Sequence, residues 1–279
     1  MKPTKAFTLI ELLVVISIIA VLVSLLIPAL GKAKDQAKKV YCSSNLRSLT
    51  IAVSMYARSN VDETPYSTNR FEVPNGWAPG WCGATHTLGT NQSLPLEEQI
   101  EGNSTDLATG LMRGLLWPYV ESTKGWRCPA DPDDTQLRSY CMAAEWFGTH
   151  TENDNSVWYD PGTAGLVYRK LSQIRHPASR FMFVDQIGQN TDAYFAIWYS
   201  RPRWWNIPNY LHRDSSVNGF ADGHVEAYKL EPETVELAEE ALGNANAING
   251  DYFMIQEDFP DNEDLKYYQR ASWGHIGWR

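Results

Sequence analysis

Basic residues are scarce in this 279-residue sequence, which has 24 Lys and Arg against 33 Asp and Glu and a formal net charge of −9. Proteins that bind nucleic acid hold the phosphates with basic patches, so the deficit argues against a nucleic-acid partner. The nucleophile-elbow pattern Gly-x-Ser-x-Gly is absent. His212, Asp214 and Ser215 are sequence neighbours, and neighbours seldom form a catalytic triad in space. We therefore expect no catalytic residues and no enzymatic activity.

Cysteine is also scarce, and no spacing between the four cysteines is that of a zinc ribbon. In a chain exported to an oxidising compartment, four cysteines are compatible with two disulfides, and three pairings are possible. The four residues are Cys42, Cys82, Cys128 and Cys141. Their spacing alone does not choose among the pairings.

Residues 7–30 contain no Gly, Lys or Arg, and their one charged side chain is Glu11. The segment is longer than the roughly 20 apolar residues that a helix needs to cross a bilayer. A carboxylate at the bilayer centre costs on the order of 3 kcal/mol, and somewhat less near the interface. The alternatives are a plain signal-anchor that tolerates the acid and a segment in which Glu11 has a function.

The residues around Glu11 resemble the processing site of type IV prepilins and type II secretion pseudopilins. The similarity covers Lys5-Ala6-Phe7-Thr8-Leu9-Ile10-Glu11 and the apolar residues after it. In that family, prepilin peptidase removes a short basic leader before a Phe, the new amino terminus is methylated, and a Glu at the fifth mature position directs assembly. The resemblance thus implies cleavage between Ala6 and Phe7, N-methylation of Phe7 and an assembly role for Glu11. Ala6 stands where the family usually has Gly.

The same resemblance divides the chain into four parts. These are a leader at 1–6, a transmembrane or fibre-core helix at 7–30, an amphipathic continuation at 31–60, and a globular head at 61–279. It places the leader in the cytoplasm and the head in the periplasm, with a single pass through the bacterial inner membrane. The basic residues that follow the span argue for the opposite orientation by the positive-inside rule. Loss of the two leader lysines would change the net charge from −9 to −11.

Periodicity predicts the elements of the head. An apolar stripe at helical spacing indicates that the first helix runs to about Ser59 and packs under the head; it comprises Cys42, Leu46, Leu49, Val53 and Tyr56. Further predicted helices are 106–120 and 232–247. Residues 126–131 are predicted to form a short strand that ends in a turn, and buried strands are expected at 181–185, within 180–187, and at 193–199. Residues 139–147 and 158–168 are each either a strand or a loop. A hairpin is expected at 217–228 around Asp222-Gly223, with positive φ at both residues. The tail 249–279 is not assigned. The predicted fold class is α+β and pilin-like, with a long N-terminal helix on a mostly antiparallel sheet.

One segment of the helical continuation and two segments of the head resemble a large pilin-like group of planctomycete-type bacteria. They are the Cys-x-x-Asn-Leu segment at Cys42, the Leu-x-Pro-Tyr and Cys-Pro-x-Asp elements within 116–131, and His-x9-Asp-Gly at His212, Asp222 and Gly223. The resemblance suggests Cys128 as the disulfide partner of Cys42. Cys82 and Cys141 remain as a second pair.

Two sets of side chains are candidate metal ligands. The first comprises Asp185, His212, Asp222 and His224, although a hydrogen bond from His212 within the hairpin is the favoured interpretation. The second comprises Asp258, Asp261, Glu263 and Asp264, which could bind calcium as a loop does in major pseudopilins. Their spacing is not that of an EF-hand, and a solvated acidic face is favoured. We expect no metal centre and no other cofactor.

The resemblance implies a structural subunit of a type IV pilus or a type II secretion pseudopilus. Its expected partners are prepilin peptidase, other pilin or pseudopilin subunits, the secretion assembly platform and the membrane. The alternative is a monomeric membrane-anchored binding protein outside the cytoplasm, with a glycan as a candidate ligand. Trp77 and Trp81 could form a sugar-binding platform, although such residues more often complete the core of a loop-rich domain.

Overall fold

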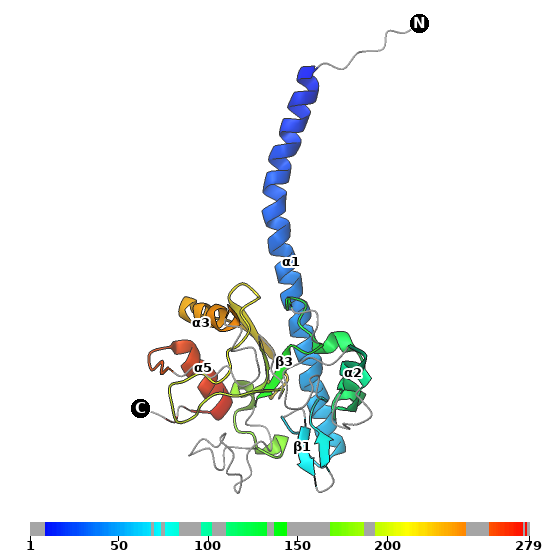
Figure 1. Ribbon diagram of the computed structural model, residues 1–279, viewed down its shortest axis with the longest axis vertical. Helices are drawn as coiled ribbons and strands as arrows, with labels where there is room; N and C mark the ends of the chain where they lie inside the picture. Colours follow the sequence, from blue (N-terminus) through cyan, green and yellow to red (C-terminus); the bar gives the residue numbers. More distant parts are fainter. Residues whose placement is uncertain are drawn as a thin grey trace.

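A long helix carries the whole head at its C-terminal end (Figure 1). The computed structural model describes residues 9–67, 70–73, 76–83, 96–101, 110–132, 137–143, 168–186, 193–243, 257–275 and 277. The helix α1 (Leu9–Ser59) includes the predicted apolar segment and its amphipathic continuation. Its first half projects away from the head, and its buried residues all lie between Cys42 and Ala57. The predicted long N-terminal helix is confirmed.

The head is built on one five-stranded sheet in the order β5-β3-β4-β6-β7. The strands are β3 (Tyr140–Ala143), β4 (Phe181–Asp185), β5 (Tyr194–Phe195), β6 (Ser215–Phe220) and β7 (Val225–Lys229). Neighbouring strands are antiparallel except β3 and β5, which are parallel. A separate hairpin joins β1 (Arg70–Val73) to β2 (Gly76–Pro79). The predicted α+β, pilin-like fold class is confirmed.

The apolar stripe of α1 packs against the sheet, mainly against β6. Four stripe residues have no exposed surface: Cys42, Leu46, Leu49 and Val53. Tyr56 is partly buried and meets the ring of Tyr119 edge-on, with 6.5 Å between the ring centroids. Each fully buried Leu or Val contributes roughly 1.5–3 kcal/mol relative to an exposed one. The stripe is therefore a main source of the attachment of the helix to the head.

A glycine of β6 permits the close approach of α1. A Cβ atom on Gly219 would lie 2.8 Å from Cγ2 of Thr50. We expect Gly219→Ala to destabilise the head by about 1–3 kcal/mol, because added methyl groups in a packed interface force neighbours to move. Thermal and urea unfolding of the full-length protein in detergent, followed by tryptophan fluorescence, would measure the loss.

Thr50→Ser provides the matched test of that contact. Serine lacks the clashing methyl group but keeps the hydroxyl that donates to the carbonyl of Arg47, at 2.8 Å. Gly219→Ala should cost less in the Thr50→Ser background, and the difference is the coupling energy of the pair. Gly31→Ala is the control, since its Cβ meets nothing within 4 Å. Equal costs in both backgrounds would show that the close approach is not responsible.

Two elements predicted between the helix and the sheet are wrong. In the described part of 106–120, two 3₁₀ turns replace the α-helix: η1 (Leu111–Arg113) and η2 (Trp117–Tyr119). Pro118 lacks an amide hydrogen, and Gly114 packs so closely on the backbone of Cys82 that a Cβ would lie 2.4 Å from its Cα. The end of η3 (Thr123–Trp126) replaces the strand predicted at the start of 126–131, whereas the turn predicted at its end is present. There, the amide of Asn45 on α1 binds the carbonyls of Lys124 and Arg127.

The C-terminal hairpin is confirmed, but its turn differs from the prediction. Only Gly223 has positive φ, at 91°, and Asp222 does not. Gly223 donates to the carbonyl of Phe220, and Phe220 donates to that of His224, so the loop has three residues. This geometry needs one left-handed residue at the glycine. The carboxylate of Asp222 accepts from both the backbone and the ring of His224.

The tail that sequence reasoning left unassigned contributes a core helix. α3 (Pro232–Gly243) matches most of the predicted helix 232–247, and α5 (Glu263–Trp273) follows it. Tyr268 of α5 is buried and shares a hydrogen bond of 3.1 Å with Asn218, whereas the next residue of β6, Gly219, faces α1. Successive strand residues face opposite sides of a sheet, so α1 and α5 cover opposite faces (Figure 1).

The remaining strand predictions are met in part. The segment 139–147, for which strand and loop were both open, contains β3, and the strand predicted at 181–185 is β4. Of 193–199, only Tyr194–Phe195 form a strand. The segment 158–168, also predicted as strand or loop, lies outside the described residues, except Tyr168. The two sites described next depend on α1, β4 and the segment before β6.

Candidate functional site

The first candidate site is the exposed N-terminal half of α1. Its residues from Leu9 to Leu30 are all exposed, and one 18-residue window has a mean hydropathy of 3.1. By length and composition, this is the one helix among the described residues that could cross a membrane. At 1.5 Å per residue, 9–30 span about 33 Å, close to the thickness of a hydrocarbon core.

Glu11 lies in the first turn of that helix and is exposed. The predicted cleavage residues Ala6 and Phe7 lie outside the described residues. At the other end of the apolar segment, Asp35 of α1 pairs with Arg213 of the head at 3.2 Å. Both side chains are about half exposed, so the pair contributes little to stability. Counted from the N-terminus of α1, this ion pair is the first contact between the described residues of the helix and the head that involves a salt bridge.

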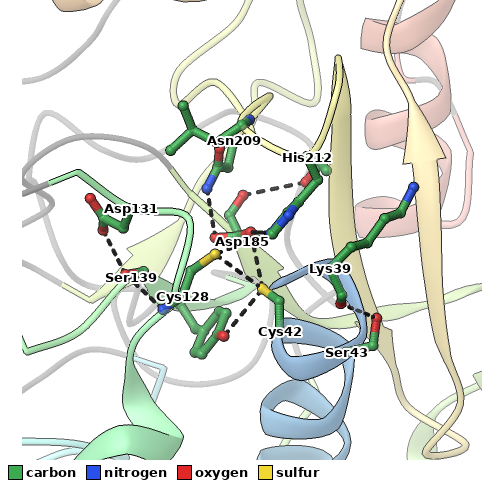
Figure 2. Close-up of polar contacts among 12 residues, drawn as sticks. Lys39, Cys42, Ser43, Cys128, Asp131, Ser139, Asp185, Asn209 and His212 are labelled. Atoms are coloured by element: carbon green, nitrogen blue, oxygen red, sulfur yellow. Dashed lines mark hydrogen bonds and ion pairs between the residues drawn. The ribbon is translucent and has the colours of Figure 1, made fainter. Parts of the chain in front are cut away.

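The second candidate site is a buried cluster of four side chains: Cys42, Cys128, Asp185 and His212. Figure 2 shows the side chain of Cys42 extending from α1 toward the other three. The Sγ atoms of Cys42 and Cys128 are 3.3 Å apart, and Sγ of Cys42 is 3.4 Å from Oδ2 of Asp185. Nε2 of His212 lies 3.1 Å from Sγ of Cys128 and 3.4 Å from Oδ2 of Asp185. None of the four residues is more than 2% exposed.

The environment of the cluster changes the acidity of its members. Burial raises the pKa of the Cys42 thiol well above its usual value, and the neighbouring Cys128 and Asp185 add to this effect. The hydrogen bond with Cys42 lowers the pKa of Cys128 against the effect of burial, and His212 assists. Burial would lower the pKa of His212, but Asp185 and Cys128 outweigh it and raise the pKa to about 9. The two thiols are therefore unequal, with Cys128 the more acidic.

Polar groups around the cluster hold its members in place. The hydroxyl of Tyr140 donates to Sγ of Cys42 at 3.2 Å. The amide of Asn209 donates to Oδ1 of Asp185 at 3.0 Å, which leaves Oδ2 directed at the cluster. The backbone amide of Cys128 donates to Ser139 Oγ at 3.1 Å. The arrangement is thus constrained from several sides.

The structure brings the predicted disulfide partners together without a bond between them. All four cysteines are buried thiols in this structure. The Cys42–Cys128 disulfide therefore stays a prediction. The second pair, Cys82 and Cys141, also stays a prediction. Burial raises the pKa of Cys82 to about 12, and Arg138 donates to Sγ of Cys141 at 3.3 Å.

The predicted role of His212 in the hairpin is wrong. Its ring lies at the buried cluster, because the segment before β6 runs past the end of β4. Of the first set of candidate ligands, Asp185 and His212 come together, whereas Asp222 and His224 pair with each other at the hairpin turn. Sequence reasoning did not place the two cysteines with them. The sequence feature that could have indicated the cluster is that Cys42, Cys128 and His212 all occur in the segments that resemble one pilin-like group.

The candidate calcium ligands have other partners. Asp258 pairs with Arg203 at 2.7 Å, and Glu263 pairs with Lys266 at 2.7 Å. Asp264 is fully buried and accepts hydrogen bonds from Tyr228 and the backbone of Glu231. The favoured solvated acidic face is consistent with Asp258, Asp261 and Glu263, which are exposed, but is wrong for Asp264. Among the described residues, these acids form no group of converging ligand atoms.

Comparisons with known proteins agree with the N-terminal site. A family described as "Prokaryotic N-terminal methylation motif" matches residues 1–27. The chain is 39% identical over 70 residues, a quarter of its length, to the "Type IV wide pilus major component PilA4" of Thermus thermophilus. That match spans about half of the relative's length. No solved structure matches the chain. The matches, together with the long apolar helix and the α+β head, show similarity to type IV pilins over the N-terminal part of the chain.

Proposed function

We propose that the chain is a structural subunit of a filament, either a type IV pilus or a type II secretion pseudopilus. Prepilin peptidase cleaves it between Ala6 and Phe7, and the new terminus is N-methylated. Before assembly it is anchored in the bacterial inner membrane by one span, with its head in the periplasm. Its further partners are other pilin-like subunits and the secretion assembly platform. The observation that carries the proposal is the methylation motif at residues 1–27, placed at the start of a projecting apolar helix.

The exposed half of α1 supports this function physically. Apolar side chains cover the helix from Leu9 to Leu30, and the head leaves them uncovered. Such a surface has to be covered by lipid or by other helices, because exposed apolar area costs about 25 cal/mol per Å². A subunit that moves from a membrane into a helical bundle exchanges one apolar environment for the other. The Thermus relative is itself a type IV pilus component, which agrees with this use.

The binding-protein alternative receives less support from the head. Trp81 has no exposed surface: it stacks on Trp126 at 5.6 Å, and its ring N–H donates to the carbonyl of Ala193. It therefore belongs to the core and forms no sugar-binding platform. The side chain of Trp77 lies outside the described part of the chain.

We expect the mature chain to begin with N-methylated Phe7 in cells that contain an active prepilin peptidase. Mass spectrometry of the N-terminal peptide would show this, and a strain with an inactive peptidase should retain Met1. Ala6→Gly restores the residue usual in the family and should be processed at least as completely, whereas a bulky Ala6→Phe should remain uncleaved. An intact Met1 in the active strain would contradict the proposal.

A further inference from the structure

We propose that Cys42, Cys128, Asp185 and His212 form a zinc-binding site that fastens the membrane helix to the head. The four ligand atoms lie within 4.8 Å of one another. They come from four separate segments: α1, the turn after η3, the end of β4, and the segment before β6 (Figure 2). Two sulfurs, one imidazole nitrogen and one carboxylate oxygen are ligand types that zinc prefers.

The distances suit a tetrahedral zinc ion. With Zn–S near 2.3 Å and Zn–N or Zn–O near 2.0–2.2 Å, ligand atoms in a tetrahedron lie roughly 3.3–3.8 Å apart. Four of the six pairs of ligand atoms are 3.1–3.4 Å apart, and all six pairs lie within 4.8 Å. Small shifts that lengthen the four shorter separations would bring the ligand atoms to tetrahedral spacing. Nε2 of His212 faces the cluster, so this nitrogen is the ligand atom.

Burial and charge favour a cation at this point. Two thiols and the Asp185–His212 pair are enclosed with almost no exposure to water, where a charge is stable only if it is paired. A divalent ion that displaces the thiol protons and the Nε2 proton of His212 would offset two of the three negative charges of the carboxylate and the two thiolates, and would accept a lone pair from each of the four ligands. The surrounding hydrogen bonds resemble an outer shell, because Asn209 orients Asp185 and Tyr140 donates to Cys42.

A disulfide between Cys42 and Cys128 would exclude this site, because a bonded sulfur is not a thiolate ligand. It would explain the proximity of the sulfurs alone. It would leave unexplained why Asp185 and His212 are brought to the same sulfurs from two other segments. A zinc ion accounts for all four side chains, and this is the reason to prefer it.

The direct test is the metal content of the full-length protein, purified from membranes in detergent without chelator. We expect about one zinc per chain by inductively coupled plasma mass spectrometry, with Cys42 and Cys128 recovered as free thiols in non-reducing peptide maps. Cys42→Ser and His212→Ala should lose the metal. His224→Ala and Cys82→Ala are matched controls outside the cluster and should retain it.

Two further measurements separate ligand loss from misfolding. His212→Cys supplies another thiolate and should retain zinc where His212→Ala does not. Cobalt bound to the unmodified protein should show the intense visible bands and sulfur charge-transfer absorption of tetrahedral thiolate coordination. Asn209→Ala, which removes a positioning residue, should weaken zinc binding by about 10–100-fold while the chain remains folded.

Several results would overturn the proposal. A Cys42–Cys128 disulfide in the folded, metal-free protein would assign the cluster to a cross-link. The zinc site would also be refuted if the reduced, folded chain failed to take up added zinc. Retention of zinc by folded His212→Ala would likewise refute the proposed ligand set. None of these readouts depends on processing or assembly, so the zinc site and the filament function can fail independently.

Discussion

Glu11→Ala is expected to abolish entry into a filament while leaving cleavage and membrane insertion intact. Insertion depends on the apolar segment, which the substitution makes more apolar. Assembly depends on a partner for the carboxylate, because an isolated charge in an apolar environment is costly. We infer that this partner is the ammonium group at mature Phe7, of the same subunit in the membrane and of a neighbouring subunit in the filament. N-methylation leaves that positive charge in place.

The expected size of the assembly defect follows from the Phe7 ammonium, which would lose its partner in Glu11→Ala. Removing one member of a buried ion pair costs about 3–5 kcal/mol, since the other charge stays buried. A loss of about 3 kcal/mol corresponds to an association weaker by roughly a hundred-fold. Glu11→Asp keeps the charge but has a shorter reach, so its assembly should be partly impaired.

The measurement compares membrane and sheared-filament fractions, together with cross-linking between neighbouring subunits. Mass spectrometry of the membrane fraction establishes that Glu11→Ala is still cleaved. Asp35→Ala is the control, because it removes a carboxylate from the same helix beyond the apolar segment. Normal assembly of Glu11→Ala would show that the acid has no role in assembly and would favour the monomeric anchored protein.

Asp264→Ala is expected to destabilise the head by about 2–5 kcal/mol. The Asp264 carboxylate is fully buried and accepts from the Tyr228 hydroxyl at 2.9 Å and from the Glu231 amide at 2.8 Å. The two donors are partly buried, and loss of the acceptor costs at most about 1–3 kcal/mol for each of them, to which the cavity left by the fully buried side chain adds. The contacts join α5 to β7 and to the residue before α3, so both C-terminal helices should loosen.

Asp258→Ala is the matched control in the same acidic segment. Asp258 is half exposed and pairs with Arg203 at 2.7 Å, so its loss should cost no more than about 1 kcal/mol. The loss of unfolding free energy in Tyr228→Phe should lie between those of the two Ala variants, because this change removes one of the two donors to Asp264. Urea unfolding of the full-length protein in detergent measures all three.

Thermal unfolding of the same proteins tests the calcium hypothesis. Millimolar calcium should leave the melting temperature of the unmodified protein unchanged if Asp264 is a structural acceptor. A rise in melting temperature that Asp258→Ala removes would instead establish a calcium site. Equal stabilities of Asp264→Ala and Asp258→Ala would contradict the structural role.

Local patterns were sufficient for the elements whose residues repeat at a regular interval. The apolar segment and the stripe from Cys42 to Val53 predicted α1, because a helix brings residues three or four apart onto one face. The apolar run at β4 predicted a buried strand, and Asp222-Gly223 predicted the β6–β7 hairpin. The resemblance around Phe7 and Glu11 indicated the prepilin motif that the family comparison then matched.

Tertiary packing decided what no local pattern contains. The turns at Leu111–Arg113 and Trp117–Tyr119 follow from close backbone contact with Cys82, and α5 is buried because its aromatic residues complete the sheet's second face. The buried four-residue cluster depends most on tertiary packing. Successive members of the cluster Cys42, Cys128, Asp185 and His212 are 27 to 86 positions apart in the sequence, and only the packing of α1 and three segments of the head brings them together. Local patterns in the sequence were enough to predict a long apolar helix with a prepilin-like start, whereas the packing of four distant segments brought two sulfurs, an imidazole nitrogen and a carboxylate oxygen to one point.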